Sequence, residues 1–209
     1  MRTLNTVNFS NKKVLIRVDF NVPLDENNRV TDHTRIKAAK PTIDKVLADG
    51  GSCVLMTHLG RPKGVDDNLS LRHIVSEIQT VLGVDIQFSK HTIGPEVEAQ
   101  AQVLQPGQIM LLENLRFYDE ETKGDEQFAN ALSTLADCYI NDAFGTAHRA
   151  HASTTIVAQF FPKAKYFGYL LAQEIDAIDR VMSTGEKPVL AVLGGAKVSS
   201  KITIIENIL

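Results

Sequence analysis

The stretch NDAFGTAHRAHAST, residues 141–154, places two histidines, an arginine and several turn-forming polar residues directly after an apolar run. If residues 137–140 form a buried strand, this stretch is the loop at the strand's carboxyl end, where open α/β sheets hold their ligands. Because the carboxyl ends of parallel strands share one edge of a sheet, polar groups that follow other strands converge on the same cleft. Such groups follow three earlier strand-like runs: Asp19 and Asn21, then His58 and Arg61, then Glu113, Asn114 and Arg116.

Arginine gives this cleft its expected chemistry. Of the nine arginines in the chain, four fall in segments that can share the edge: Arg35, Arg61, Arg116 and Arg149. Four guanidinium groups repel one another unless an anion lies between them, and each can bind phosphate or carboxylate through two parallel hydrogen bonds. The cluster therefore predicts a small metabolite that carries several negative charges.

Each of these residues also has a structural interpretation. Asp and Asn are common turn formers, and a lone arginine after a strand is usually solvated or half of an ion pair. Arg17 lies inside its strand, so we expect a structural ion pair there. His148 and His151 have the spacing of a metal pair, but no third ligand has a recognisable spacing. We therefore expect no metal site.

A second phosphate-binding candidate is LGGAKVSSKI, residues 193–202. A strand followed by Gly194, Gly195 and a helix start would let backbone N–H groups approach a phosphate, with Lys197 and Lys201 nearby for charge. The spacing fits neither a Walker A loop nor a GxGxxG dinucleotide loop. The alternative is a tight strand-to-helix turn whose two lysines are simply exposed.

Short β-branched runs alternate with helix-period segments, which is typical of βαβ units. We expect an α/β fold: a three-layer, Rossmann-like, mainly parallel sheet with helices on both faces, followed by the start of a second α/β domain. Helices should follow Pro41, Ser70, Pro95 and Asp125, with Arg35 just before the first of them. The acidic stretch 118–127 is expected to be a solvated loop. The expected strands are residues 13–20, 52–58, 84–88, 108–114, 137–142, 165–171 and 187–193.

A domain boundary is predicted near residue 184, where TGEKP separates an amphipathic segment from a new strand and a glycine-rich loop. We expect one α/β domain at residues 1–170, an interdomain helix and hinge at 171–187, and the start of a second domain at 188–209. The last helical run carries an apolar stripe with no partner in the remaining sequence. The simplest interpretation is a truncated chain.

Composition narrows the classes of partner. The 22 basic and 25 acidic residues give a net charge of −3, which offers no sign of a nucleic-acid or membrane partner. Cys53 and Cys138 lie in apolar runs without a CxxC motif, which favours a reducing compartment. No apolar stretch has the length of a signal peptide or a membrane span. We expect a cytoplasmic protein.

Five motifs, RVDFNVPL, THLGRP, ENLRF, NDAFGTAHRAHAST and GGAKVSSKI, follow one another along the chain. In this order and at these separations they resemble the amino-terminal half of the phosphoglycerate kinase family, from about Lys13 to the end of the chain. The resemblance implies two Rossmann-like domains joined by a long helix, the first binding the glycerate and the second the nucleotide. It also implies phosphate transfer in glycolysis between 1,3-bisphosphoglycerate and ADP, which gives 3-phosphoglycerate and Mg-ATP.

The resemblance further implies roles for individual residues. Asp19 and Asn21 would contact the hydroxyl and carboxylate region of the glycerate, and Arg35 would face the transferring phosphoryl group as a catalytic residue together with Lys197. Ser200 departs from the family, which commonly has Asp there, so one carboxylate fewer lies near the nucleotide. The remaining glycerate contacts would be His58, Leu59, Gly60, Arg61, Arg116, Arg149 and His151, and the nucleotide phosphates would meet Gly194, Gly195, Lys197 and Lys201.

The rest of the expected nucleotide domain, with the family's GGGD segment and its magnesium-contacting aspartate, does not occur in this sequence. We therefore expect 3-phosphoglycerate binding with little or no turnover. For the full-length protein we expect a monomer that uses Mg-ATP or Mg-ADP as co-substrate, without a tightly bound cofactor. One alternative is a non-catalytic anion-binding module. Another is a Rossmann-type dehydrogenase, but DFNVPLDENN offers no dinucleotide fingerprint after the first strand.

Overall fold

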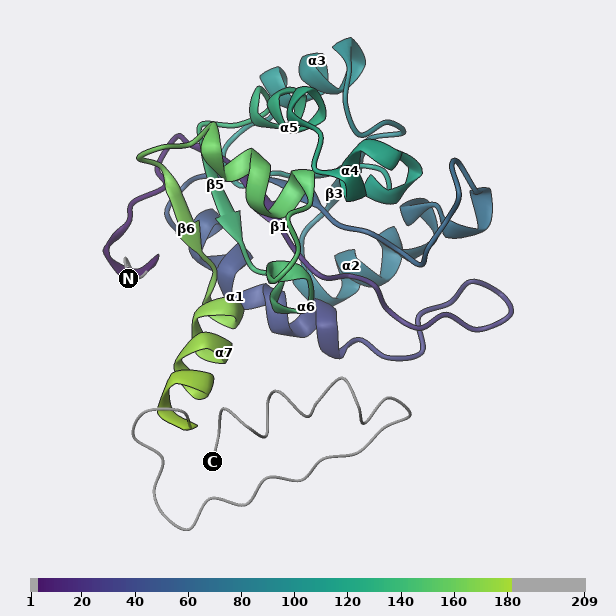
Figure 1. The fold of residues 1–209 in the computed structure, drawn as a ribbon, viewed down its shortest axis with the longest axis horizontal. Helices are drawn as coiled ribbons and strands as arrows, with labels where there is room; N and C mark the ends of the chain where they lie inside the picture. The colour runs from purple at the N-terminus through teal and green to yellow at the C-terminus, as the bar shows by residue number, and fades with distance from the viewer. Residues whose placement is uncertain (1–3, 182–209) are drawn as a thin grey trace. The chain divides into compact units, whose positions relative to one another are not determined.

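The computed structural model describes residues 4–181, and its centre is a six-stranded sheet with parallel pairing throughout (Figure 1). The strand order is β3-β4-β2-β1-β5-β6. Six of the seven predicted strands are confirmed, all of them shorter than expected, and the seventh lies outside the described residues. The strands are β1 (Lys13–Arg17), β2 (Ser52–Met56), β3 (Ile86–Phe88), β4 (Ile109–Leu111), β5 (Cys138–Asn141) and β6 (Lys165–Phe167).

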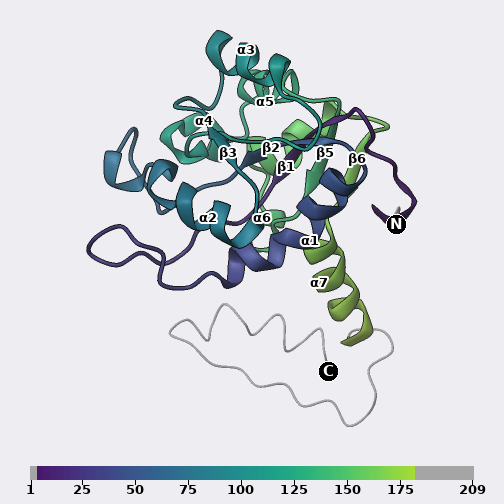
Figure 2. The same cartoon turned by 180° about the vertical axis from the view of Figure 1, so that it is seen from behind.

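Helices cover both faces of the sheet (Figure 2). α1 (Thr34–Ala48) and α2 (Val75–Leu82) pack on one face, and α3 (Pro95–Val103) and α5 (Glu126–Ser133) pack on the other. Side chains of β1 alternate between the two cores, because successive residues of a strand point to opposite faces. The three-layer α/β fold is therefore confirmed. The other helices are α4 (Asp119–Lys123), α6 (Phe144–Ala147) and α7 (Tyr169–Asp179).

Local sequence signals set several helix ends. Pro95 opens α3 as predicted, since its missing N–H has no partner in the first turn of a helix. Asp125 caps α5 by accepting a hydrogen bond from the N–H of Phe128 at 2.8 Å. Gly83 ends α2 in the left-handed region, with φ of 75°. These elements needed no tertiary contact to be predicted.

The predicted start of α1 at Pro41 is wrong. The helix begins at Thr34 and runs through the proline, so Arg35 lies in its first turn rather than before it. Asp32 fixes this start by accepting hydrogen bonds from the N–H and Oγ of Thr34, at 2.8 and 2.6 Å. The buried face of α1, which includes Ile36 on the amino-terminal side of the proline, offsets the hydrogen bond that Pro41 removes.

The strand predicted at residues 165–171 ends at Phe167, and α7 begins at Tyr169. Two side chains accept hydrogen bonds from the N–H groups at this helix start. Thr42 Oγ accepts from Tyr169 at 2.9 Å, and Asp142 Oδ1 accepts from Leu171 at 3.2 Å. Gly168 has to be glycine, because a Cβ there would lie 2.1 Å from Asp142 Oδ1. The residues from Tyr169 onward therefore form a capped helix in place of the predicted strand.

The chain divides into two compact units, Met1–Ala172 and Gln173–Leu209, and the boundary falls within α7. Of the predicted interdomain helix and hinge at residues 171–187, residues 182–187 lie outside the described residues, and the predicted second domain lies entirely outside them. Both stay predictions. Across residues 4–181, no helix is both long and apolar enough to cross a membrane.

Asp142 makes stability depend on pH in the opposite direction to an ion-paired carboxylate. It is fully buried, and burial raises its pKa from 3.8 to about 6. Because the folded state holds the proton more tightly than the unfolded chain, this contribution to stability is fully present below pH 3.8 and is lost as the pH rises through about 6.

We therefore expect urea unfolding of the wild type and Asp142→Asn to differ in their pH response. Between pH 4.5 and 7.5 the wild type should lose more free energy of unfolding than the variant does, by on the order of 2 kcal/mol. Asp85→Asn, at an exposed carboxylate, should follow the wild type. Parallel pH profiles for the wild type and Asp142→Asn would contradict this assignment.

Candidate anion-binding site

Segments that follow β1, β2 and β4 meet at one edge of the sheet together with the first turn of α1. Asn21 Oδ1 accepts a hydrogen bond from the N–H of Gly60 at 2.8 Å. Arg116 Nη1 donates to the carbonyl of the same glycine, also at 2.8 Å. Arg35 forms an ion pair with Asp19. These contacts bring together four segments that are far apart in sequence.

A buried amide shapes the turn at Leu59 and Gly60. Asn114 Nδ2 donates to the carbonyls of Leu59 and Leu69 at 2.8 and 2.9 Å. Its Oδ1 accepts from the N–H groups of Leu59 and Arg116 at 3.2 and 3.1 Å. Gly60 adopts a φ of 64°, and a Cβ there would lie 2.9 Å from the Leu69 side chain, so the turn requires glycine. Asn114 thus holds the backbone that Arg116 contacts.

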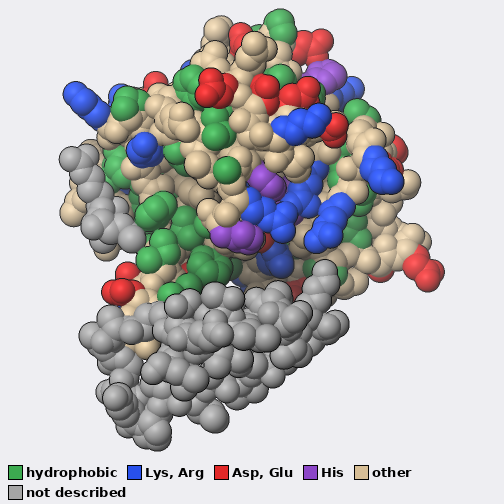
Figure 3. Space-filling model, in the orientation of Figure 1, with side chains coloured by type: hydrophobic (Ala, Val, Ile, Leu, Met, Phe, Trp, Pro, Cys, Tyr) green, Lys and Arg blue, Asp and Glu red, His purple; other side chains and the backbone are tan. Residues whose placement is uncertain are grey.

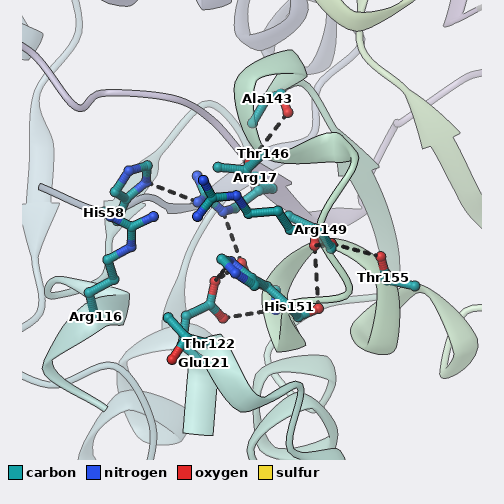
Figure 4. A network of polar contacts seen from close by, with 12 residues as sticks. Arg17, His58, Arg116, Glu121, Thr122, Ala143, Thr146, Arg149, His151 and Thr155 are labelled. Carbon is teal, nitrogen blue, oxygen red and sulfur yellow. Dashed lines mark hydrogen bonds and ion pairs between the residues drawn. The ribbon is translucent and has the colours of Figure 1, made fainter. Parts of the chain in front are cut away.

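Arg17 lies at the carboxyl end of β1 and is fully buried. Its Nε donates to Ser153 Oγ at 2.9 Å, Nη1 donates to the carbonyl of Val18, and Nη2 lies 3.1 Å from His58 Nδ1 (Figure 4). These described contacts are hydrogen bonds and not the direct ion pair expected from the sequence. Arg17 is therefore part of the polar network at this edge, which sequence patterns did not indicate.

The contact with Arg17 determines the protonation of His58. A guanidinium can only donate, so His58 Nδ1 accepts, and the ring proton lies on Nε2. Burial, followed by the charges of Arg17 and Arg116, lowers the pKa of His58 to about 2. His58 is therefore a neutral N–H donor and not a cation at physiological pH.

Three of the four predicted arginines line one pocket of about 290 Å³. Arg61, Arg116 and Arg149 share its wall with Pro62, Tyr118, Asp119 and Thr122. Burial and the charges of Arg17 and Arg149 lower the pKa of Arg116, which reflects the crowding of like charges. The fourth arginine, Arg35, pairs with Asp19 instead. Figure 3 shows Lys, Arg and His side chains gathered on this face of the molecule.

Another pocket, of about 320 Å³, opens beside β6 and differs in character. Tyr139, Tyr166 and Phe167 form much of its lining, and Lys165 is its single cationic residue. A multiply charged anion is bound best by several cationic donors, and this pocket offers one. The chemistry of the lining therefore favours the arginine pocket as the candidate site, although the apolar pocket is slightly larger.

The acidic stretch expected to be a solvated loop contains a buried carboxylate. Residues 119–123 form α4, and Glu121 within it is 1% exposed. Its Oε2 accepts from the N–H of Ser153 at 2.9 Å, and its Oε1 accepts from Ser153 Oγ at 2.6 Å. The Oε1 atom also lies 3.7 Å from His151 Nδ1. Burial lowers the pKa of His151, while Glu121 opposes this shift.

Sequence patterns missed Glu121 and Ser153 as parts of this site. No apolar periodicity marks the acidic stretch, and Ser153 looks like an ordinary turn residue. The described residues contain no group of three His, Cys, Asp or Glu side chains that could hold a metal ion. Several predicted residues lie outside the described part of the chain: Gly194, Gly195, Lys197, Ser200 and Lys201.

Comparison with known proteins gives the family. The family model described as phosphoglycerate kinase matches residues 4–209. The chain belongs to the phosphoglycerate kinase family. It is 52% identical over 208 residues to the phosphoglycerate kinase of Moorella thermoacetica, with 99% of this chain and 52% of the relative covered. It is 47% identical over 231 residues to that of Porphyromonas gingivalis, with 99% of this chain and 55% of the relative covered.

A solved structure supports the same family. The phosphoglycerate kinase from Pyrococcus horikoshii superposes with a TM-score of 0.89 at 32% identity, over 100% of this chain and 52% of that chain. The chain thus spans about half the length of the relatives it matches. In sequence it corresponds to the amino-terminal part of a phosphoglycerate kinase.

The geometry around His58 predicts its behaviour in solution. We expect its ring to stay neutral, with the proton on Nε2, from pH 8 down to about pH 4, because protonating Nδ1 would place it against a buried guanidinium. Long-range ¹H–¹⁵N correlation spectra report the tautomer, and His58→Gln assigns the resonance. A titration midpoint above pH 5, or a proton on Nδ1, would contradict the contact with Arg17.

Proposed function

We propose that this chain provides the glycerate-binding part of a phosphoglycerate kinase. The complete protein would transfer phosphate between 1,3-bisphosphoglycerate and ADP, giving 3-phosphoglycerate and ATP. Family membership supports the reaction class, and the arginine pocket is the observation that carries the choice of ligand. Its three guanidinium groups suit a phosphate, since each can form two parallel charge-assisted hydrogen bonds with it.

The residues at the edge of the sheet fit the two ends of 3-phosphoglycerate. We assign the phosphate end to Arg61, Arg116 and Arg149, which share one pocket. We assign the hydroxyl and carboxylate end to Asp19 and Asn21, which lie near each other after β1. The remaining assigned contacts are His58 as a neutral donor, the backbone of Leu59 and Gly60, and His151.

Arg35 is assigned to the transferring phosphoryl group. It lies in the first turn of α1 and reaches the Asp19 carboxylate, so it adjoins the hydroxyl and carboxylate end rather than the arginine pocket. A cation there neutralises charge that builds up on the phosphoryl oxygens as they move. Lys197, outside the described residues, is assigned a matching role from the nucleotide side.

This reaction needs no general base from the described residues. The acceptor is a carboxylate, which is already ionised at neutral pH. Catalysis then consists of positioning two substrates and neutralising phosphoryl charge, which guanidinium and ammonium groups do well. Water must be excluded from an acyl phosphate, so we propose that the nucleotide part closes over this edge, with residues 171–187 as hinge material.

Mg-ATP or Mg-ADP is proposed as the co-substrate of the complete protein. Gly194, Gly195, Lys197 and Lys201 would contribute to holding its phosphates, and further contacts would come from the half of the relatives that this chain does not match. We propose a monomer, with no tightly bound cofactor. Two free, buried cysteines, Cys53 and Cys138, are compatible with a proposed cytoplasmic location.

Calorimetric titration with 3-phosphoglycerate tests the substrate. We expect saturable binding by the 209-residue chain. The Arg35→Ala, Arg149→Ala double variant should weaken it about 100-fold or more, since a charge-assisted hydrogen bond contributes about 1.5 to 3 kcal/mol.

The matched control is Lys12→Ala, Lys163→Ala, which removes the same charge from exposed residues that precede β1 and β6, at the opposite edge of the sheet. It should bind like the wild type. Absence of binding by the folded wild-type chain, or an equal loss in the control, would reject the assigned site.

Turnover is a separate question from binding. Because the chain matches only about half of its relatives, we expect it to bind 3-phosphoglycerate but to form ADP from Mg-ATP no faster than a blank. A coupled assay with the purified chain measures this rate. Clear 3-phosphoglycerate-dependent ADP formation would show that the described domain and residues 182–209 suffice for catalysis, contrary to the proposed division of labour.

A further inference from the structure

A carboxylate that does not line the arginine pocket lies directly behind it. Glu121 on α4 is 1% exposed, and both of its oxygens accept hydrogen bonds from Ser153, one from the backbone N–H and one from Oγ. Ser153 belongs to the helical turn Ala152–Ile156, which follows the loop that carries Arg149 and His151. Glu121 therefore ties α4 to the segment that presents two of the assigned site residues.

The hydroxyl of Ser153 connects Glu121 to Arg17. It accepts from Arg17 Nε at 2.9 Å and donates to Glu121 Oε1 at 2.6 Å. Only one direction is possible, because a guanidinium can only donate and an ionised carboxylate can only accept. Arg17 then donates from Nη2 to His58 Nδ1. Figure 4 shows Glu121 on α4, Arg17 at the end of β1 and His58 after β2 converging from these three elements.

The connection through Ser153 gives the buried guanidinium of Arg17 a nearby negative charge. Arg17 has no exposure to solvent, and a buried cation without a counter-charge is strongly destabilising. Glu121 is the buried carboxylate that reaches Arg17 through a single hydroxyl. The other charged or titratable groups that act on this region are Arg35, Arg61, Arg116, Arg149, His151 and Tyr139, and the four arginines add positive charge rather than balance it.

We propose that Glu121 is a positioning residue of the anion site. Through Ser153 it holds Arg17, and through Arg17 it holds His58 in the orientation that turns Nε2–H away from the guanidinium. The affinity for an anion then depends on a carboxylate that does not touch it. This inference rests on the proposed function only for the identity of the anion.

The proposal and simple electrostatics predict opposite signs for the same substitution. Removing a negative charge near a cationic pocket should strengthen anion binding if Glu121 acts only through its charge. If Glu121 positions Arg17, its loss should weaken binding, because the cationic donors are no longer held in place. The sign of the change in affinity therefore decides between them.

The test compares Glu121→Gln, Ser153→Ala and their double variant by calorimetry with 3-phosphoglycerate and, separately, with inorganic pyrophosphate. We expect each single variant to weaken binding about tenfold, and the double variant to lose little more, since both substitutions break one connection. Glu120→Gln, which removes an exposed carboxylate one residue away, should bind within about twofold of the wild type.

Tighter or unchanged binding by a folded Glu121→Gln variant would overturn the proposal, as would additive losses in the double variant. If Glu121→Gln does not fold, Ser153→Ala carries the test, because it keeps the carboxylate and breaks the connection. Binding of pyrophosphate without 3-phosphoglycerate would reject the proposed substrate and leave this test intact.

A third measurement does not need a ligand. The Arg17 Nε–H resonance should exchange slowly with water in the wild type and in Glu120→Gln, and at least about tenfold faster in Glu121→Gln and Ser153→Ala. Equal exchange in all four proteins would overturn the proposal even if no anion bound.

Discussion

The burial of the Arg17 charge is the constraint on which this edge of the sheet depends. A guanidinium removed from water must find hydrogen-bond acceptors and a counter-charge, or the fold loses several kcal/mol. Arg17 finds acceptors on Ser153, Val18 and His58. Because β1 lies between β2 and β5, the loops that follow these two strands must close over its end to supply them. Their positions are thus tied to one buried cation.

The same edge keeps an excess of positive charge. Five arginines, at positions 17, 35, 61, 116 and 149, lie in or around it, and the acidic partners nearby are few: Asp19, Asp119 and Glu121. Burial, and after it the charges of Arg17 and Arg149, lower the pKa of Arg116. A fold selected for stability alone would not gather like charges in this way. Such a cluster is typical of a binding site, because a bound anion relieves the repulsion between the charges. The positive charge of the candidate site therefore lowers the stability of the fold that carries it.

Much of the fold could be predicted because its signals are local. Apolar runs marked the strands, and Pro95, Asp125 and Gly83 marked helix ends through their own backbone chemistry. The polar residues that follow the strands also predicted an anion site at this edge, and that site stays a prediction. These features depend on neighbouring residues, which a single sequence displays.

The predictions that failed depend on contacts between distant residues. Pro41 is normally a helix breaker, and only the packing of α1 against the sheet keeps it inside the helix. Glu121 can be buried because Ser153, 32 residues away, donates hydrogen bonds to both of its carboxylate oxygens. The helix start at Tyr169 depends on Thr42 and Asp142, which lie 127 and 29 residues away from the N–H groups that they accept from. No local pattern carries that information.

The hydrogen bond from Arg17 to Ser153 spans 136 positions along the chain. On the ribosome, β1 is therefore made long before the hydroxyl that its last residue needs. Until Ser153 has been synthesised, the Arg17 guanidinium is more stable in water, because burying it without that acceptor costs free energy. Contacts of such long separation form late and slow the folding of a domain. We therefore expect the candidate site and the fold of this domain to be completed together.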